Sequence, residues 1–173
     1  MQLIEVDKEF ITASASVILT GISSNDDYLI TYCGVQPNDD NKDLYMRFGN
    51  SGTAYTSSNY YNSSIGLLAD ASFQSNAVSG NGCFIIEYAR GNASEETNNG
   101  VIDLYNVFPS GKSPTATWTQ SGANYGNTNA SEQGGGALSD TSSYSEVHFA
   151  WESGGNFKAN ANGYFALYKV VRG

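Results

Sequence analysis

Charged residues are scarce in this sequence, at 14% of 173 residues, against about 25% in an average globular domain. Basic residues are the scarcer kind, with eight Lys and Arg against seventeen Asp and Glu, and they form no cluster. The net charge of −9 repels polyanions, so no nucleic-acid partner is expected. No run approaches the roughly 20 apolar residues of a membrane-spanning helix, so no membrane partner is expected either.

Histidine is nearly absent as well, since His148 is the only one and a metal site built on two histidines is excluded. His148 alternates with Val147 and Phe149, so it is expected to be a hydrogen-bonded or solvent-facing strand residue. A catalytic triad also needs a nucleophile on a sharp turn and an acid matched to the histidine. The sequence shows neither pattern, and we therefore expect a protein that is not an enzyme.

The first ten residues lack the basic and apolar segments of a secretory signal peptide. We therefore expect a chain that is made and retained in a cytoplasm, which disfavours a secreted lectin or hydrolase. Cys33 and Cys83 both lie in apolar, strand-like runs. Without export, two free buried thiols are favoured over a disulfide between them.

Glycine and tyrosine are abundant, with 19 and 12 residues, and aromatic residues reach 13% of the chain. Gly and Asn suit turns, whereas Tyr, Thr and Val suit pleated surfaces. This composition predicts an all-β protein with many turns. A length of 173 residues fits one domain with its own hydrophobic core.

The most informative stretch is the C-terminal one, residues 146–173. Val147, Phe149 and Trp151 recur at period two, a glycine-bearing loop follows, and residues 164–171 form an aromatic and branched run. This pattern predicts a β-hairpin that closes the fold. In its last strand, one face is expected to carry Phe165 and Leu167 and the other to carry Tyr164, Ala166 and Tyr168.

Other strand-like runs precede this hairpin at spacings typical of a sandwich. Residues 53–82 are ambiguous, since 65–68 fit either a helical turn or an edge strand, and residues 121–143 are expected to form a long polar loop. The sequence predicts a single-domain, jelly-roll-like antiparallel β-sandwich of about eight to ten strands. Residues 1–17 would form an N-terminal arm or the first strand, and 18–173 the sandwich. The remaining predicted strands are 3–6, 14–20, 28–35, 44–48, 83–90, 101–108 and 116–119.

Three stretches carry a resemblance to a known family. They are YLITYCGVQPNDDNKDLYMRFGNSG at 28–52, the Gly-Asn-Gly-Cys step at 80–83, and FAWESGGNFKANANGYFALYKV at 149–170. Together they resemble the jelly-roll β-sandwich domain found in virion structural and tail-fibre proteins of tailed phages, marine and cyanobacterial ones especially. The shared features are structural glycines and core aromatics.

The resemblance implies a domain without a cofactor that assembles as a homotrimer in the virion. Because the sequence shows no coiled coil or anchoring domain, we expect a capsid decoration or cement protein that binds the major capsid protein. The alternative is a tail-fibre or tail-tip adhesin module that binds host cell-surface polysaccharide.

Three sets of residues are candidates for these contacts. The apolar residues of segment 1–10 could form a capsid-docking arm or simply the first strand. The second face of the last strand could meet another copy or be buried under the chain's own loops. Loop tyrosines could stack on glycans. In the same order, the sets are Leu3, Ile4, Val6 and Phe10; Tyr164, Ala166 and Tyr168; and Tyr55, Tyr60, Tyr61 and Tyr125.

Carboxylates cluster at Asp39, Asp40 and Asp43, with Asn41 and Lys42 between them. Such oxygen ligands could touch calcium, but the spacing lacks the closing Glu of an EF-hand loop. A plain turn is the favoured interpretation, and no metal site is predicted.

Overall fold

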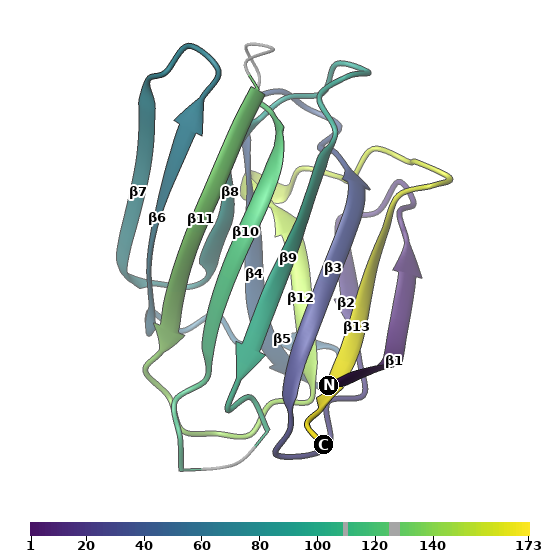
Figure 1. The fold of residues 1–173 in the computed structure, drawn as a ribbon, viewed down its shortest axis with the longest axis vertical. Coiled ribbons are helices and arrows are strands. Elements are labelled where there is room, and N and C mark those ends of the chain that lie inside the picture. The colour runs from purple at the N-terminus through teal and green to yellow at the C-terminus, as the bar shows by residue number, and fades with distance from the viewer. Residues whose placement is uncertain (109–110, 125–128) are drawn as a thin grey trace.

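The computed structural model describes residues 1–108, 111–124 and 129–173. It consists of two antiparallel sheets packed face to face, with the large sheet in front of the small one in Figure 1. The predicted all-β, single-domain sandwich is confirmed. The predicted count of eight to ten strands was too low, because the described residues form thirteen.

The large sheet has eight strands, and its two edges are the first strand and the seventh. Its outer face is turned toward the viewer in Figure 1. In spatial order the strands are β1 (Gln2–Phe10), β13 (Tyr164–Val171), β3 (Asp27–Val35), β9 (Asn98–Tyr105), β10 (Thr115–Ala123), β11 (Asn129–Leu138), β6 (Tyr60–Leu68) and β7 (Phe73–Asn81).

The small sheet has five strands and covers the inner face of the large one. β12 pairs with both β2 and β4, and β4 also pairs with β5 and β8. A short 3₁₀ turn, η1 (Glu152–Gly154), follows β12. Within the described residues, no helix has the length and apolarity needed to cross a membrane. The bounds of the strands are β2 (Ser16–Leu19), β12 (Glu146–Trp151), β4 (Lys42–Asn50), β5 (Thr53–Ala54) and β8 (Phe84–Arg90).

Aromatic rings join the two sheets. Phe165 of β13 stacks on Phe149 of β12 with ring centroids 4.2 Å apart, and it contacts Phe157 and Tyr32 at 5.9 and 5.5 Å. Phe165 and Leu167 are fully buried, as the alternation of the last strand predicts. Rings packed in this way add about 0.5–1.5 kcal/mol per pair to the free energy of area burial.

The predicted C-terminal hairpin is wrong, although both of its strands exist. β12 belongs to the small sheet, where it lies between β2 and β4, whereas β13 belongs to the large sheet between β1 and β3. The connection between β12 and β13 therefore crosses from one sheet to the other. Phe149 of β12 and Phe165 of β13 enter the core from opposite sides, where their rings stack.

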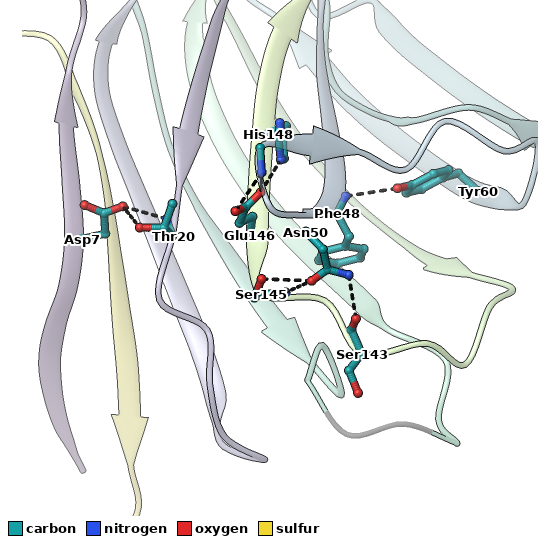
Figure 2. Close-up of polar contacts among 10 residues, drawn as sticks. Asp7, Thr20, Phe48, Asn50, Tyr60, Ser143, Ser145, Glu146 and His148 are labelled. Carbon is teal, nitrogen blue, oxygen red and sulfur yellow. Dashed lines mark hydrogen bonds and ion pairs between the residues drawn. The ribbon is translucent and has the colours of Figure 1, made fainter.

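Segment 1–10 is the first strand rather than a separate arm. β1 pairs with β13 along its length, with a bulge between Glu5 and Asp7. The Asp7 carboxylate accepts the backbone N–H and the hydroxyl of Thr20, at 2.7 and 3.0 Å, which ties β1 to the end of β2 (Figure 2). Residues 1–17 therefore fold as part of the sandwich.

The two segments that the sequence left ambiguous or assigned to a loop contain strands. Residues 53–82 include the β6–β7 hairpin, and most of the predicted loop 121–143 is occupied by the end of β10 and by β11. β6, β7, β10 and β11 together form one half of the large sheet.

Candidate functional site

The outer surface of this half of the sheet is a regular array without charge. Four outward positions on each of the four strands align in register, and none of the sixteen is a charged residue. We call this array the uncharged face. Across β7, β6, β11 and β10 its rows are Phe73, Leu67, Ser131, Ser121; Ser75, Ile65, Gln133, Thr119; Ala77, Ser63, Gly135, Thr117; and Ser79, Tyr61, Ala137, Thr115.

A groove of about 640 Å³ crosses the uncharged face. Its floor is low because Ser63, Gly135 and Thr117 are small, while Ile65 and Gln133 line it from the next row. At its β9 end the groove meets Val101 and Asp103. Burial raises the pKa of Asp103, the carboxylate on the groove's rim. Its lining thus offers hydroxyl, amide and carboxyl groups beside apolar ones.

Large apolar side chains gather at the β7 side of the same face. Phe73 is 76% exposed, and its cross-strand neighbour Leu67 is 52% exposed. With Ile65 they line a second hollow of about 390 Å³. Contiguous patches of exposed apolar side chains are typical of surfaces that bind a protein, a membrane or a ligand.

On the inner side of these strands, the Glu132 carboxylate of β11 meets charged side chains of β8. Arg90 of β8 is fully buried between two carboxylates, with Nη2 3.3 Å from Glu132 and Nε 3.5 Å from Glu87. Glu132 also accepts hydrogen bonds from Gln120 Nε2 at 2.8 Å and from the Ser64 hydroxyl. These residues form the buried charge cluster, which joins β8 to β6, β10 and β11.

Tyr32 of β3, a strand in the other half of the large sheet, completes this cluster. The Tyr32 hydroxyl donates to Glu87 Oε1 at 2.6 Å. Burial raises the pKa of Glu87 to about 7. Burial also raises the pKa of Asp43, at the start of β4, to about 6. All members of the cluster are at least nine-tenths buried, so the arrangement holds the sheets together and offers no charged group to an external substrate.

His148 lies on the outer side of the small sheet and is buried against Glu146. Its Nε2 is 3.0 Å from Glu146 Oε2, and the same carboxylate accepts the Gly52 N–H at 2.9 Å (Figure 2). The expectation of a hydrogen-bonded histidine is confirmed, and the acid partner that the sequence did not reveal is two residues away. The nearby Ser145 hydroxyl donates to Asn50 Oδ1 and not to His148. The pair therefore anchors the turn before β5.

Of the predicted glycan-contact tyrosines, Tyr55 and Tyr60 lie together, with ring centroids 6.2 Å apart, but they pack against the core and not on an exposed loop surface. Tyr60 is fully buried, and its hydroxyl accepts the Phe48 N–H at 3.0 Å (Figure 2). The same hydroxyl donates to the Tyr55 carbonyl, so the assignment of Tyr60 to a glycan site is wrong. Tyr55 is partly buried and donates to Asp140. Tyr61 is exposed on the uncharged face, and Tyr125 lies outside the described residues. Alternation explains the difference between Tyr60 and Tyr61, because adjacent strand residues point to opposite faces.

The predicted oligomer face is largely covered by the chain itself. Ala166 is fully buried, and the Lys8 ammonium of β1 lies 4.4 Å from the centre of the Tyr164 ring. Tyr168 is partly buried beside Glu5. This face is therefore covered mainly by residues of the same chain. The covering residues belong to the strand β1 and not to a loop.

The predicted docking residues of segment 1–10 divide by exposure. Leu3, Ile4 and Phe10 are exposed on β1, while Val6 packs against the core. Val6 approaches Gly21, where an added Cβ would lie 2.8 Å from the valine. The exposed three remain available for contact with another molecule.

The acidic segment 39–43 is a turn that runs into the first residues of β4, and its carboxylates bind backbone N–H groups of β8 and of the loop that follows it. Asp40 accepts the Asn92 N–H at 2.9 Å, and Asp43 accepts the Ala89 N–H at 2.8 Å. Among the residues described, no group of three or more His, Cys, Asp or Glu side chains is placed to hold a metal ion. Cys33 and Cys83 are both free, with Cys83 buried and Cys33 partly so.

Sequence reasoning missed the uncharged face, although part of its signal is present. Thr115, Thr117 and Thr119 alternate with Ala116 and Trp118, which is the period of a half-buried strand. The next strand, β11, has Gly134, Gly135 and Gly136 at its centre, and this glycine run is more typical of a loop.

Comparisons with known proteins identify no relative of this chain. No family model, curated protein or solved structure matches it.

Proposed function

We propose that this chain is a structural subunit of a virus particle and that it docks on the capsid shell through the uncharged face. The observation that carries this proposal is an array of sixteen outward positions without charge on a chain of net charge −9. Burying a charge at an interface is costly, and the cores of protein interfaces are depleted of charged residues. An acidic protein therefore binds most readily through its uncharged surface.

The dimensions of the face indicate how it would bind. Four strands about 4.8 Å apart and seven residues along each give an array of about 14 by 20 Å between outermost Cα atoms. This is well under the roughly 800 Å² per partner of a stable interface. A single copy would bind weakly, and many copies on a repeating shell would hold by effective concentration. Leu3, Ile4 and Phe10, exposed on β1, supply a second contact.

The class of assembly rests on the resemblance of residues 28–52 and 149–170 to virion sandwich domains. The proposed partner is the major capsid protein, and the proposed location is the assembled virion. Decoration of a shell requires a stoichiometric number of copies, which distinguishes it from a tail component.

Quantitative mass spectrometry of purified particles from the virus that encodes this chain tests the proposal. We expect hundreds of copies in a fixed ratio to the major capsid protein. A few copies to a few tens would move the chain to the tail or its fibres. Its absence from particles would overturn a virion role.

The groove supports a second candidate function, the binding of a neutral host-surface polysaccharide by a fibre or tail-tip module. Hydroxyl groups of Ser63 and Thr117, the Gln133 amide and the Asp103 carboxylate line a trough that crosses β6, β11, β10 and β9. Three strand spacings give about 14 Å, which is the length of a short oligosaccharide. Polar side chains that converge in such a trough can fix the orientation of sugar hydroxyls.

Titration with a panel of neutral oligosaccharides, followed by calorimetry, tests this candidate. Binding that is lost in Gln133→Ala and kept in the matched variant Gln74→Ala, on the inner side of β7, would support it. The absence of heat with every sugar at millimolar concentration would remove it.

A further inference from the structure

The two edges of the large sheet differ in how they are protected. Edge strands expose unpaired backbone groups, and natural proteins block them with charges, proline or bulges. β1 carries Glu5, Asp7, Lys8 and Glu9 and has a bulge between Glu5 and Asp7. Its edge is therefore poorly suited to pairing with another strand.

The opposite edge, β7, has neither charges nor proline, and its one bulge lies at the C-terminal end of the strand, at Gly80. Its nine residues, FQSNAVSGN, include no charged residue and no proline, and pairs from Phe73 to Ser79 are in regular register with β6. No other described strand pairs with its outer edge. Alternate N–H and C=O groups of a regular edge strand point away from the sheet, so β7 is a template for a further antiparallel strand.

We propose that the β7 edge binds the β7 edge of a second copy of this chain, antiparallel and about a twofold axis at Ala77. A contact of this kind is isologous, because the same strand supplies both sides. The axis pairs Ala77 with its equivalent, Ser75 with Ser79, and Phe73 with Asn81. The small central side chains allow close approach, and paired serines can exchange hydrogen bonds across the strands.

Charge favours a second copy as the occupant. Two chains of net charge −9 repel each other over most of their surfaces, but β7 brings no charged residue to the contact. The antiparallel arrangement also places the turn that carries Asp70 of each copy near the end of the other copy's β7. At that end Arg47 Nε donates to the Gly82 carbonyl at 2.8 Å. In this arrangement the acidic turn of one copy would approach the end of β7 near which Arg47 of the other copy lies.

The proposed dimer would make one continuous sheet of sixteen strands, with two uncharged faces side by side. It is a twofold assembly, in contrast to the threefold one that the phage resemblance implies. The dimer does not depend on the capsid proposal, because it forms from the purified chain alone.

Sedimentation equilibrium of the purified chain, with two oppositely charged variants, tests the proposal. We expect a mass twice the chain's 18.5 kDa. Ala77→Asp and Ala77→Lys each place like charges opposite each other at the axis, and each should weaken the dimer at least tenfold. An equimolar mixture of the two variants should restore it, because the opposed charges then attract.

The matched control is Ser63→Asp, which adds the same charge to the adjacent strand in the same row. The two new carboxylates would lie about 14 Å apart, farther than the screening length of about 8 Å at physiological salt. This variant should remain a dimer. Because residues 63 and 77 are both exposed, circular dichroism should show all variants folded.

Three results would overturn the proposal. They are a single-copy mass for the wild type at every concentration, a threefold mass, and a dimer that Ala77→Asp and Ala77→Lys leave unchanged. A fourth contradicting result would be association of the wild type with a different protein and not with itself, because the β7 edge would then bind that protein.

Discussion

The two halves of the large sheet distribute polar residues in opposite ways. In the half made by β1, β13, β3 and β9, the inner face buries Leu167, Ile30 and Ile102, and the outer face carries Asp103 on β9 and, with two strands between them, Glu5 on β1. In the other half, the inner face buries Glu132 and Gln120, and the outer face has no charge. The two halves therefore differ in where their charged groups lie, on the outer face in one half and on the inner face in the other.

This difference separates two physical roles. The apolar half stabilises the fold by burial and is solvated by its charged outer surface. The other half carries polar groups inside, where Arg90 and two glutamates must satisfy one another. Its outer face carries no charge, so removing that face from water when a partner binds costs little free energy. Contact with another molecule is thus expected on the half whose own core is the more polar one.

The largest expected effect is on the buried charge cluster. Arg90→Met would leave Glu87 and Glu132 buried without a counter-charge and should lower the free energy of unfolding by about 3–5 kcal/mol. Urea denaturation of the variant measures this. The matched variant Arg47→Met removes a partly exposed guanidinium and should cost only about 1 kcal/mol. Equal losses in the two variants would show that the cluster is not a special feature of the polar half.

The second effect is a dependence of stability on pH. The pKa of Glu87 is raised to about 7 and that of Asp43 to about 6, so the folded state holds more protons than the unfolded state above the usual carboxyl range. Stability should therefore fall as the pH rises from 5 to 8, by on the order of 3 kcal/mol. Glu87→Gln, compared with the wild type in urea titrations across this range, should flatten most of the slope. A wild type whose stability rises with pH would contradict the assignment.

Two adjacent glycines compare the inner and outer sides of β11 directly. A Cβ on Gly134 would lie 2.6 Å from the Trp118 ring, whereas one on Gly135 would lie 3.3 Å from the Ala116 carbonyl. Gly134→Ala should cost about 1–3 kcal/mol through overpacking, and Gly135→Ala about 0.5 kcal/mol or less. Thermal unfolding of both variants measures the difference. The reverse order would show that the two sides have been misassigned.

The smallest effect on stability is expected on the uncharged face itself. Thr117→Glu adds a charge at an exposed position and should change the free energy of unfolding by no more than about 0.5 kcal/mol. Chemical denaturation checks this. A much larger loss would mean that the face is uncharged for the sake of the fold and not for contact.

The sequence predicted the apolar strands β12, of the small sheet, and β13, of the large sheet, far better than the polar half of the large sheet. Alternation of Val147, Phe149 and Trp151, and of Phe165 and Leu167, correctly identified core positions, because these strands have one apolar face. The pairing was wrong, since period two identifies a strand's faces but not its neighbours. The position of β12 and β13 in different sheets depends on contacts with distant strands.

Most of the polar half escaped prediction, although residues 116–119 of β10 were predicted as a strand, because neither face of β6, β7 and β11 is uniformly apolar. In β6, the polar residues Asn62 and Ser64 point inward, whereas the apolar residues Ile65 and Leu67 point outward. Hydrophobicity therefore predicts the wrong face of this strand as the buried one. In β11, Glu132 is buried only because Arg90, Gln120 and Ser64 surround it. Such pairing is set by tertiary structure, and no local pattern encodes it.

The most direct test of the central claim is whether charge on the uncharged face prevents docking on particles. Purified wild type and the double variant Thr117→Glu, Gln133→Glu would be titrated onto particles that lack the chain, with Thr31→Glu on the other half as control. We predict saturable binding of the wild type and control at a fixed ratio to the shell protein, and at least tenfold weaker binding of the double variant. Equal binding of all three would contradict the claim that this face makes the contact.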